Sequence, residues 1–532
     1  MRHYSVSLSQ TNWKNNLVED YIAGSDFLKS FYQYEPNADS FITAINDRKN
    51  FSVNRQLLVD ELLNQNADYF PTYPLLQKQI EVLRDENAFT VTTGHQLGIA
   101  GGPLFFLYKI ITTINLAKQI QSKHKEYKIV PVFWMATEDH DFEEIASVKV
   151  FNNKLKWNYP DPSGACGELS TDSLNELIEE LKKINGETAN AIELNKILSD
   201  CYQTGLTLAE ATRKFVYALL GKYGVIVLDA NNSKLKKTFA DVMRDELLNH
   251  TAHQKVNETS ERLAEKYRSQ VFPREVNLFY KDKNLRERFI DRRDGIFKVS
   301  NTDLFFPNDI LLDMLDKFPD RFSPNVIMRP LYQERILPNL AYVGGPGEVA
   351  YWLQLKSLFD YHQIFFPIII NRNNALIISD KLLKKAAGSG LQANEIFKDE
   401  QSLIDLVLSR TIKEDFDLSS AKKIIGEEFT TVSVKALSID ATLEKYIQSE
   451  RQKTENALEN IEKKMLQAIK KKNENSLNVA KQIADEVFPN KKPQEREQSL
   501  IPFYLKKGKE GIDFMLEYMN PLSNEILVVV TE

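Results

Sequence analysis

Residues 89–135 carry the pattern of two buried strands joined by a glycine-bearing loop and a helix. The run 89–93 is short and rich in β-branched residues, and the loop 94–102 that follows contains four glycines. Pro103 then opens an apolar helix, a position at which proline costs no hydrogen bond. Residues 128–135 are almost continuously apolar, as in a strand buried on both faces of a parallel sheet. This order predicts a βαβ unit, which almost always crosses over with a right hand.

Further apolar runs place the rest of the sheet far along the chain. Residues 225–228 follow a helical stretch, and 365–370 form another buried run. A sheet assembled from such distant segments predicts an α/β fold with a Rossmann core and insertions. The expected segments are an N-terminal helical lead-in (1–88), the first part of the core (89–250), an insertion (251–325), the second part of the core (326–385), a second small insertion (386–440), a coiled coil (441–490) and a C-terminal segment that packs back on the core (491–532).

The stretch 441–490 is rich in Glu and Lys and carries almost no glycine or proline. Ile447, Thr454, Ile461 and Ala468 are spaced seven residues apart, which is the repeat of a coiled coil. An unbroken helix over this stretch would reach roughly 75 Å, too long for a helix inside a core. A two-helix hairpin, an intermolecular dimer and a solvated helix packed on its own domain all remain open.

Charge and cysteine content narrow the classes of function. The net charge of −6 disfavours a nucleic-acid partner, which normally needs a basic face. The two cysteines, Cys166 and Cys201, match no zinc-ligand spacing, so no metal ligand is assigned. The N-terminus lacks the apolar segment of a signal peptide, and no run approaches the ~20 apolar residues of a membrane helix. We therefore expect a cytoplasmic protein without a membrane or nucleic-acid partner.

Polar and glycine residues follow the first strand of the βαβ unit, at the edge where ligands bind in open α/β sheets. The candidate nucleotide-binding residues there are Thr93, Gly94, Gln96, Gly98 and Gly102. Glycines let the backbone approach a phosphate, and the start of the next helix offers free N–H groups. A tight structural turn would explain the same glycines, because neither a Walker A loop nor a GxGxxG motif is present.

A charged run follows the second strand, at Glu138, Asp139, His140 and Asp141. Three carboxylates beside one imidazole are costly to bury, so we expect this run to face a polar cleft. It could orient the imidazole for acid–base chemistry or hold Mg²⁺, and it could equally cap the helix that follows. Asp139, His140 and Asp141, together with His95 after the first strand, are the candidate catalytic residues.

A third group of candidates lies later in the chain. Arg329 offers a guanidinium fork for a carboxylate or phosphate, although an isolated arginine is more often part of a surface ion pair. Residues 344–347, Gly-Gly-Pro-Gly, form a strand-to-helix turn that places Glu348 in the first helical turn, with Tyr351 one turn later. With Lys109 from the helix after the glycine loop, these are the candidate substrate-binding residues.

Six motifs together resemble the BshC family, the cysteine-adding enzymes of bacillithiol biosynthesis. In chain order they are Thr93-Gly94-His95-Gln96, Gly102-Pro103-Leu104, Pro131-Val132-Phe133-Trp134, Glu138-Asp139-His140-Asp141, Arg329-Pro330 and Gly345-Pro346-Gly347-Glu348-Val349-Ala350-Tyr351. The resemblance covers essentially the whole chain, including the coiled coil. His95 stands where the family pattern often has glutamine, so we assign acid–base chemistry to His140.

The resemblance implies a nucleotidyl-transferase-type Rossmann core similar to that of class I aminoacyl-tRNA synthetases, with connecting-peptide insertions and a coiled coil that forms a homodimer. In such a core, residues 93–96 occupy the place of the first synthetase signature, and 137–141 resemble the Gly-Thr-Asp-Glu-His-Gly element. The lysine-rich second signature is absent, and the nearest substitute is the group of lysines in 379–385.

The implied reaction joins the carboxyl group of L-cysteine to the amine of glucosaminyl-malate in the last step of bacillithiol biosynthesis. A free carboxylate must first be activated, for which the resemblance implies ATP or ADP, with Mg²⁺. His140, oriented by Asp139 or Asp141, would accept the amine proton, and Arg329 or Lys109 would bind the malyl carboxylates. Two other interpretations stay open: a non-catalytic nucleotide-binding regulator or scaffold that acts through its coiled coil, and an aminoacyl-transferring enzyme that acts on tRNA.

Overall fold

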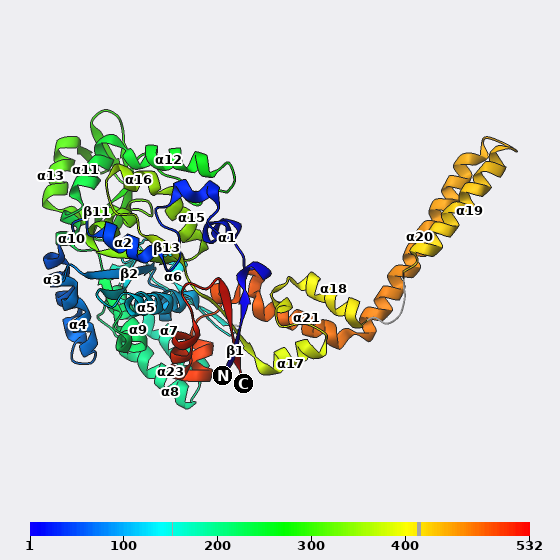
Figure 1. The fold of residues 1–532 in the computed structure, drawn as a ribbon, viewed down its shortest axis with the longest axis horizontal. Coiled ribbons are helices and arrows are strands. Elements are labelled where there is room, and N and C mark those ends of the chain that lie inside the picture. Colours follow the sequence, from blue (N-terminus) through cyan, green and yellow to red (C-terminus); the bar gives the residue numbers. More distant parts are fainter. Residues whose placement is uncertain (152, 412–416) are drawn as a thin grey trace.

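Five parallel strands form the central sheet of this computed structural model, which describes residues 1–151, 153–411 and 417–532 (Figure 1). The strand order is β13-β12-β2-β3-β6, and each neighbouring pair is parallel. The strands are β2 (Ala88–His95), β3 (Lys128–Met135), β6 (Ile226–Asp229), β12 (Asn339–Gly344) and β13 (Ile368–Asn371). A parallel sheet built from these distant segments confirms the predicted α/β fold with a Rossmann-type core.

The predicted βαβ unit is present as β2, α5 (Phe105–Lys123) and β3. β2 pairs with β3 from Ala88 opposite Lys128 to His95 opposite Met135, and α5 packs against both strands. β2 runs two residues beyond the predicted strand 89–93, so Gly94 and His95 belong to the strand end. Gly94 and the side chain of His95 therefore lie at the carboxyl edge of the sheet.

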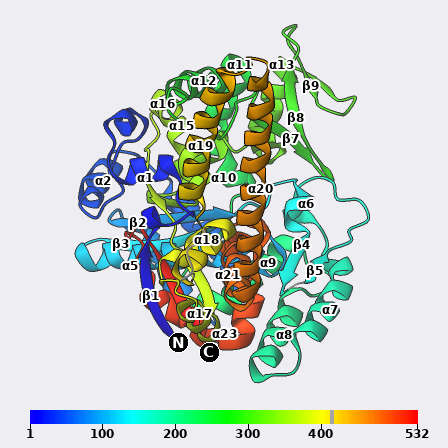
Figure 2. The ribbon, with the colours of Figure 1, turned by 90° about the vertical axis from the view of Figure 1, so that its right-hand side faces the viewer.

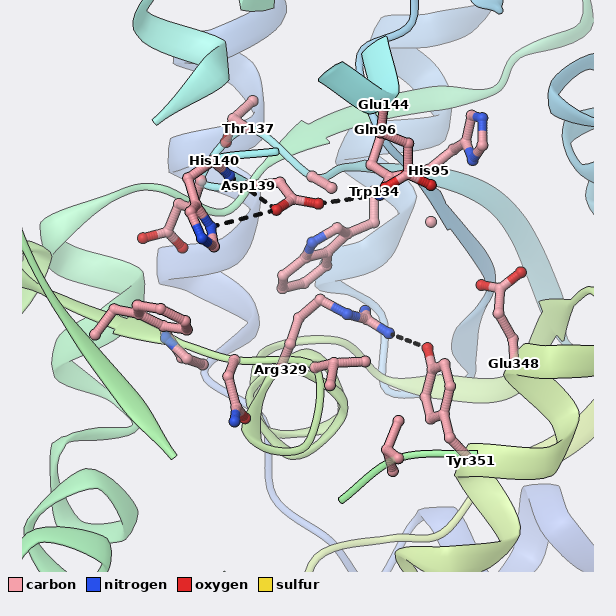
Figure 3. A pocket seen from close by; sticks show the side chains of 18 of the residues that line it. His95, Gln96, Trp134, Thr137, Asp139, His140, Glu144, Arg329, Glu348 and Tyr351 are labelled. Atoms are coloured by element: carbon pink, nitrogen blue, oxygen red, sulfur yellow. Dashed lines mark hydrogen bonds and ion pairs between the residues drawn. The ribbon is translucent and has the colours of Figure 1, made fainter. Parts of the chain in front are cut away.

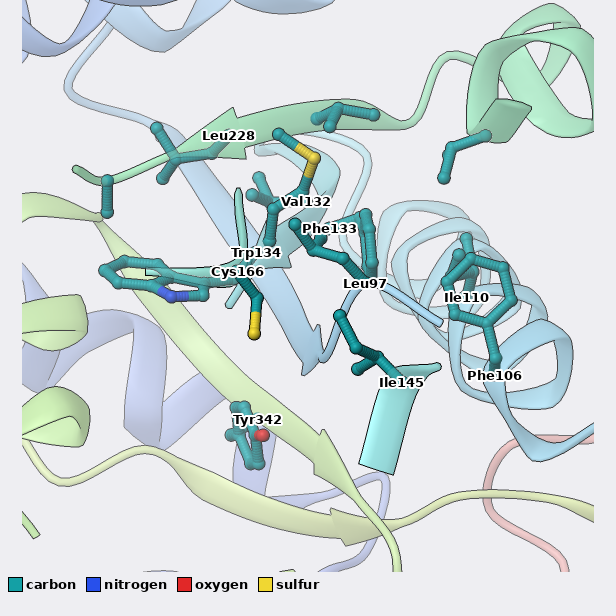
Figure 4. Packing of buried hydrophobic residues seen from close by; sticks show 14 of the residues in the cluster. Leu97, Phe106, Ile110, Val132, Phe133, Trp134, Ile145, Cys166, Leu228 and Tyr342 are labelled. Carbon is teal, nitrogen blue, oxygen red and sulfur yellow. The ribbon is translucent and has the colours of Figure 1, made fainter. Parts of the chain in front are cut away.

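Apolar packing beneath this edge fixes the ends of β2 and β3. Figure 4 shows Phe106 and Ile110 from α5 beside Val132 and Phe133 from β3, with Leu97 from the loop after β2. All five side chains are buried in one cluster. Burial of a side chain of this size stabilises the fold by about 1.5–3 kcal/mol, so the cluster holds the strand ends in place.

The insertion expected at 251–325 contains a five-stranded antiparallel sheet in the order β10-β9-β8-β7-β11. Its strands are β7 (Leu278–Asp282), β8 (Leu285–Asp291), β9 (Ile296–Val299), β10 (Phe305–Pro307) and β11 (Phe322–Pro324). In the sequence, 276–280 and 295–299 look like the two strands of a hairpin joined by an Asp/Arg turn, but this interpretation is wrong, because β8 lies between them and pairs with both. The apolar pattern of the sequence did not predict β8, because one of its buried positions holds a charged residue, Arg286, where an apolar residue is expected.

The two chain ends meet in a third sheet. β1 (Arg2–Ser7) pairs antiparallel with β15 (Glu525–Thr531), and β14 (Asn374–Ser379) pairs parallel with the other side of β15. Figure 1 shows the termini next to each other at this sheet. The segment 1–88 is therefore not helical throughout. Its first residues form β1, which pairs with β15 at the other end of the chain.

Two antiparallel helices project from the body as an arm, α19 (Ser419–Leu437) and α20 (Leu443–Lys472) (Figures 1 and 2). The arm is thus a two-helix hairpin, but its first helix lies inside the stretch 386–440 that we had separated from the coiled coil. α20 has 30 residues and is roughly 45 Å long. α21 (Glu474–Val487) continues the chain back to the body, where it packs against α17 (Asp380–Gly388) and α18 (Glu400–Thr411).

The remaining helices cover the sheets and complete the body. They are α1 (Asn16–Ile22), α2 (Ser40–Arg48), α3 (Arg55–Asn66), α4 (Pro74–Glu81), α6 (Phe142–Ile145), α7 (Asn175–Asn185), α8 (Ala189–Cys201), α9 (Leu208–Leu220), α10 (Ser233–Lys237), α11 (Ala240–Asn249), α12 (Thr251–Leu263), α13 (Asn308–Lys317), α14 (Met328–Ile336), α15 (Pro346–Gln354), α16 (Lys356–Tyr361), α22 (Gln494–Glu497) and α23 (Ile501–Tyr518); a short hairpin pairs β4 (Ser147–Val150) with β5 (Asn153–Lys156). α23 packs against α5 and α8. None of the helices in the described ranges combines the length and apolar character needed to cross a bilayer.

Candidate active site

A cavity of about 960 Å³ opens at the carboxyl edge of the parallel sheet. Its walls come from the ends of β2 and β3, from the start of α15 and from the insertion sheet. Nine of the residues predicted from sequence line it: Gly94, His95, Gln96, Lys109, Asp139, His140, Arg329, Glu348 and Tyr351. Figure 3 shows most of these side chains converging on the same space, although they come from segments more than 200 residues apart.

The other four predicted residues do not line the cavity. The hydroxyl of Thr93 is buried and donates to the carbonyl oxygen of Val343 at 2.7 Å, which ties β2 to β12. Gly98 and Gly102 shape the loop, because a Cβ on Gly98 would lie 3.0 Å from the Cα of Gly102 and Gly102 has a φ of 67°. Asp141 caps α6 by accepting from the backbone N–H of Glu144 at 3.3 Å. These four positions build the frame of the site.

Lys109 and Glu348 form a buried ion pair on one wall of the cavity. Lys109 also donates to the carbonyl oxygen of Gly94 at 2.8 Å. Burial by itself raises the pKa of Glu348, but the charge of Lys109 and the N–H of Gly345 outweigh it, so that the pKa is lowered. Each of the two side chains is therefore neutralised by the other. Lys109 is better described as a structural cation of the cavity wall than as a free substrate-binding group.

Arg329 differs from Lys109 because it has no ion-pair partner within the described ranges. Its guanidinium donates to the side-chain oxygen of Gln333 at 3.0 Å and to the hydroxyl of Tyr351 at 3.1 Å. It also lies 5.8 Å from the ring centroid of Trp134 and 5.5 Å from that of Tyr342, within the range of cation–π attraction. Although burial opposes it, the two tyrosines raise the pKa of Arg329 further, so this cation remains charged.

His95 is packed in an apolar corner of the cavity. Its ring centroid lies 5.1 Å from that of Phe105 and 5.5 Å from that of Phe106. Burial, followed by the nearby charges of Lys109 and Arg372, lowers the pKa of His95 well below its usual value. The imidazole is therefore neutral and a poor proton acceptor near neutral pH.

His140 is held by a residue that the sequence did not point to, Arg286 on β8. A guanidinium nitrogen of Arg286 lies 2.6 Å from Nδ1 of His140, and Nε of Arg286 donates to the hydroxyl of Ser323 at 2.9 Å. Arg286 also stacks over the ring of Phe279, 4.0 Å from its centroid. Because a guanidinium has no acceptor, Nδ1 of His140 must accept this hydrogen bond, and the ring proton then resides on Nε2. Burial, and next the charge of Arg286, lower the pKa of His140.

The carboxylates around His140 have separate partners. Glu138 forms an ion pair with the buried Lys236 of α10. Asp139 accepts from the backbone N–H of His140 at 2.8 Å and from the side-chain amide of Gln96 at 3.1 Å. The same amide of Gln96 donates to Glu144 at 2.6 Å, so Gln96 links two carboxylates at the cavity wall. No reason to select Glu144 is visible in the sequence, because it looks like an ordinary residue of a short charged helix.

The described part of the chain contains no preformed cluster of metal-ligating side chains, and its two cysteines are buried. No group of three or more His, Cys, Asp or Glu side chains there is arranged to hold a metal ion. Cys166 and Cys201 are buried free cysteines, and burial raises the pKa of each to about 12. The lysines of 379–385 are also no part of this site, since Lys381 and Lys385 line a separate cavity beside α21.

The chain matches two family models that together span it almost completely. Residues 1–373 match "Bacillithiol biosynthesis BshC, N-terminal Rossmann-like domain", and residues 375–531 match "Bacillithiol biosynthesis BshC, C-terminal coiled-coil domain". Three similar proteins carry the name "Putative cysteine ligase BshC". That of Flavobacterium psychrophilum is 40% identical over 98% of both chains, that of Flavobacterium johnsoniae 38% over 98% of this chain and 99% of that protein, and that of Cytophaga hutchinsonii 36% over 98% and 97%.

A solved structure described as "putative arginyl t-RNA synthetase from Campylobacter jejuni" also matches the chain. It shares 10% identity, covers 87% of this chain and 98% of its own, and has a TM-score of 0.20. This score is too low to relate the two folds, so the comparison of the core with the synthetases stays a prediction.

Proposed function

Since the chain belongs to the BshC family of bacillithiol biosynthesis proteins, we propose that it is a ligase that joins the carboxyl group of L-cysteine to the amine of glucosaminyl-malate. The names of its relatives support the ligase class and cysteine as one substrate. The family description supports bacillithiol biosynthesis as the setting. The amide bond, the second substrate and the energy source are our proposals.

The observation that carries the proposal is a pair of guanidiniums without carboxylate partners in the cavity wall, of which Arg286 is buried and Arg329 is half-buried. Arg329 and Arg286 both line the cavity, and within the described ranges neither is ion-paired. A charge that is removed from water without a counter-charge costs several kcal/mol, so such residues are suited to an anionic ligand. A malyl group carries two carboxylates, and a guanidinium fork can hold a carboxylate with two parallel hydrogen bonds. We assign Arg329 to a malyl carboxylate.

Activation of the cysteine carboxylate is proposed to use ATP. A free carboxylate is a poor acyl donor, and conversion to a mixed anhydride with phosphate provides a leaving group. Gly94 and Gln96 line the cavity at the carboxyl edge of the sheet, where ligands of open α/β folds bind, and Phe105 at the start of α5 lines it too. Mg²⁺ would enter with the nucleotide, because this ion is commonly held by phosphates together with one or two carboxylates.

The arm is proposed to form a homodimer. Ile424, Val432 and Val434 of α19 and Ile461 of α20 are exposed in the single chain, with Val434 at 67% exposure. Exposed apolar side chains at intervals along a helical hairpin are suited to a second hairpin. Sedimentation of the full chain at micromolar concentration should therefore give the mass of a dimer.

The function is tested with the purified full-length chain, glucosaminyl-malate, L-cysteine, ATP and Mg²⁺. Mass spectrometry should detect bacillithiol, and its formation should require all three substrates. Arg329→Lys keeps the charge but loses the fork, so it should raise KM for glucosaminyl-malate at least tenfold with a smaller change in KM for cysteine. Free glucosamine, which lacks both carboxylates, should be a poor substrate for the wild type and the variant alike. Absence of bacillithiol under all conditions would contradict the ligase function and would favour a non-catalytic nucleotide-binding protein.

A further inference from the structure

The amine that forms the amide bond must lose a proton, and a residue of the cavity must accept it. We propose that Glu144 accepts this proton and that Gln96 is a positioning residue that holds the Glu144 carboxylate at the cavity wall. The inference rests on the proposed ligase function and assigns proton transfer to a residue that neither the motifs nor the family comparison point to.

His140, the obvious candidate, is in the wrong tautomer for this task. Its Nδ1 accepts a hydrogen bond from Arg286 at 2.6 Å, and Nε2 therefore already carries the ring proton. A second proton would have to displace the contact with Arg286 and would place two cations side by side. His140 is thus arranged to donate a hydrogen bond from Nε2, which suits an anionic oxygen of a carboxylate or phosphate.

The other carboxylates that line the cavity have partners of their own, including Glu287 of β8, which accepts from the side-chain amide of Asn301 at 3.1 Å. Glu348 is paired with Lys109, and Glu138 with Lys236. Asp139 accepts two hydrogen bonds, one at each carboxylate oxygen. His95 has no charged partner, but burial lowers its pKa too far for it to hold a proton at neutral pH.

Glu144 combines access with a suitable affinity for a proton. It lines the cavity, and Gln96 donates to its Oε2 at 2.6 Å, whereas its Oε1 has no hydrogen-bond partner among the residues that the structure describes. Figure 3 shows Glu144 and Gln96 close together, with a dashed line from Asp139 to Gln96. Burial raises the pKa of Glu144 most, followed by the charges of Asp139 and Asp141, and these effects exceed the opposing ones of Gln96 and Lys109. A carboxylate so perturbed is a better base near neutral pH than an ordinary glutamate.

The neutral amine nitrogen attacks the carbonyl carbon of the activated cysteinyl group, an acyl–phosphate anhydride. A C–N bond forms, the C–O bond to the phosphate group breaks, and the phosphate group leaves with the electron pair. The nitrogen loses its proton to Oε1 of Glu144, which then releases it to water at the open side of the cavity.

Glu144→Gln tests this assignment, with Glu143→Gln as the matched control, because the neighbouring Glu143 pairs with Lys156 and does not line the cavity. Loss of a general base lowers rates by roughly 10²–10⁴-fold, so Glu144→Gln should lower kcat by at least ~100-fold. Glu144→Asp should restore part of the rate, and Glu143→Gln should stay within ~3-fold of the wild type. His140→Asn should raise KM more than it lowers kcat, and it should keep the acid limb of the pH profile.

The pH profile separates a base from a merely structural residue. Activity should fall on the acid side as Glu144 becomes protonated. Gln96→Leu removes a hydrogen bond that lowers the pKa of Glu144, so the acid limb should move to higher pH. Asp139→Asn removes a charge that raises this pKa, so the limb should move to lower pH.

Two results would overturn the assignment while leaving the ligase function in place. One is an active wild type whose Glu144→Gln variant keeps kcat within ~3-fold. The other is an acid limb that stays fixed in both Gln96→Leu and Asp139→Asn. A wild type that forms no bacillithiol would instead contradict the proposed function itself, so the two failures are distinguishable.

Discussion

The buried pair of Lys109 and Glu348 gives the sharpest prediction about stability. The side chain of Lys109 is 4% exposed and that of Glu348 is 22% exposed. Removal of one member of a buried ion pair costs roughly 3–5 kcal/mol, because the remaining charge stays in the interior without a partner. Lys109→Met leaves Glu348 with the N–H of Gly345 and the hydroxyl of Tyr342 as donors. We therefore expect a loss near the lower end, about 3 kcal/mol.

Glu348→Gln should cost at least as much as Lys109→Met, since the more deeply buried charge then loses its partner. The double variant Lys109→Met/Glu348→Gln removes both charges and should lie within about 1 kcal/mol of the wild type. Urea unfolding followed by tryptophan fluorescence measures this, because Trp134 and Trp352 are buried in the core around the site. Single variants that lose less than about 1 kcal/mol, or a double variant that loses the sum of both, would refute the claim that the pair is electrostatically coupled.

Four further predictions concern separate parts of the molecule. Both cysteines should resist a thiol-reactive disulfide reagent in the native protein at pH 8, since burial raises each pKa to about 12, and rapid labelling before unfolding would contradict this. Arg286→Met should raise the pKa of His140, seen by NMR titration of the ring, because Arg286 lowers it; an unchanged pKa would argue against the contact. Thr207→Ala removes the N-cap of α9 and should cost about 1 kcal/mol in urea unfolding, and no measurable loss would show that the capping box adds nothing. Ile424→Asp with Val434→Asp should convert the dimer to a monomer in sedimentation, and an unchanged mass would place the interface elsewhere.

The central part of the fold could be predicted because its signals are local. The glycine loop, the proline at the helix start and the two apolar runs around it each follow from short-range backbone and burial preferences. The residues that line the site at the ends of β2 and β3 were found for the same reason, since ligands gather at the carboxyl edge of a parallel sheet. Arg329 and Glu348 came from motifs, and the fold brings them to the same cavity.

The rest depends on contacts that no local pattern encodes. β1 is a strand because it pairs with β15 at the other end of the chain. Arg286 contacts His140, which lies 146 residues earlier in the sequence. Its strand, β8, is so rich in charged residues that the sequence looks like a turn. The first helix of the arm, α19, has an apolar repeat too weak to be separated from its surroundings, and it is recognised only by its packing on α20.

The ligase function is tested most directly by following the carboxylate oxygens of the substrate. Cysteine labelled with ¹⁸O in its carboxyl group is incubated with the chain, glucosaminyl-malate, ATP and Mg²⁺. Activation followed by amide formation predicts that each bacillithiol formed leaves one ¹⁸O in AMP or in inorganic phosphate. Bacillithiol formed without transfer of label to either would contradict activation through a phosphate anhydride, and the absence of bacillithiol would contradict the ligase function as a whole.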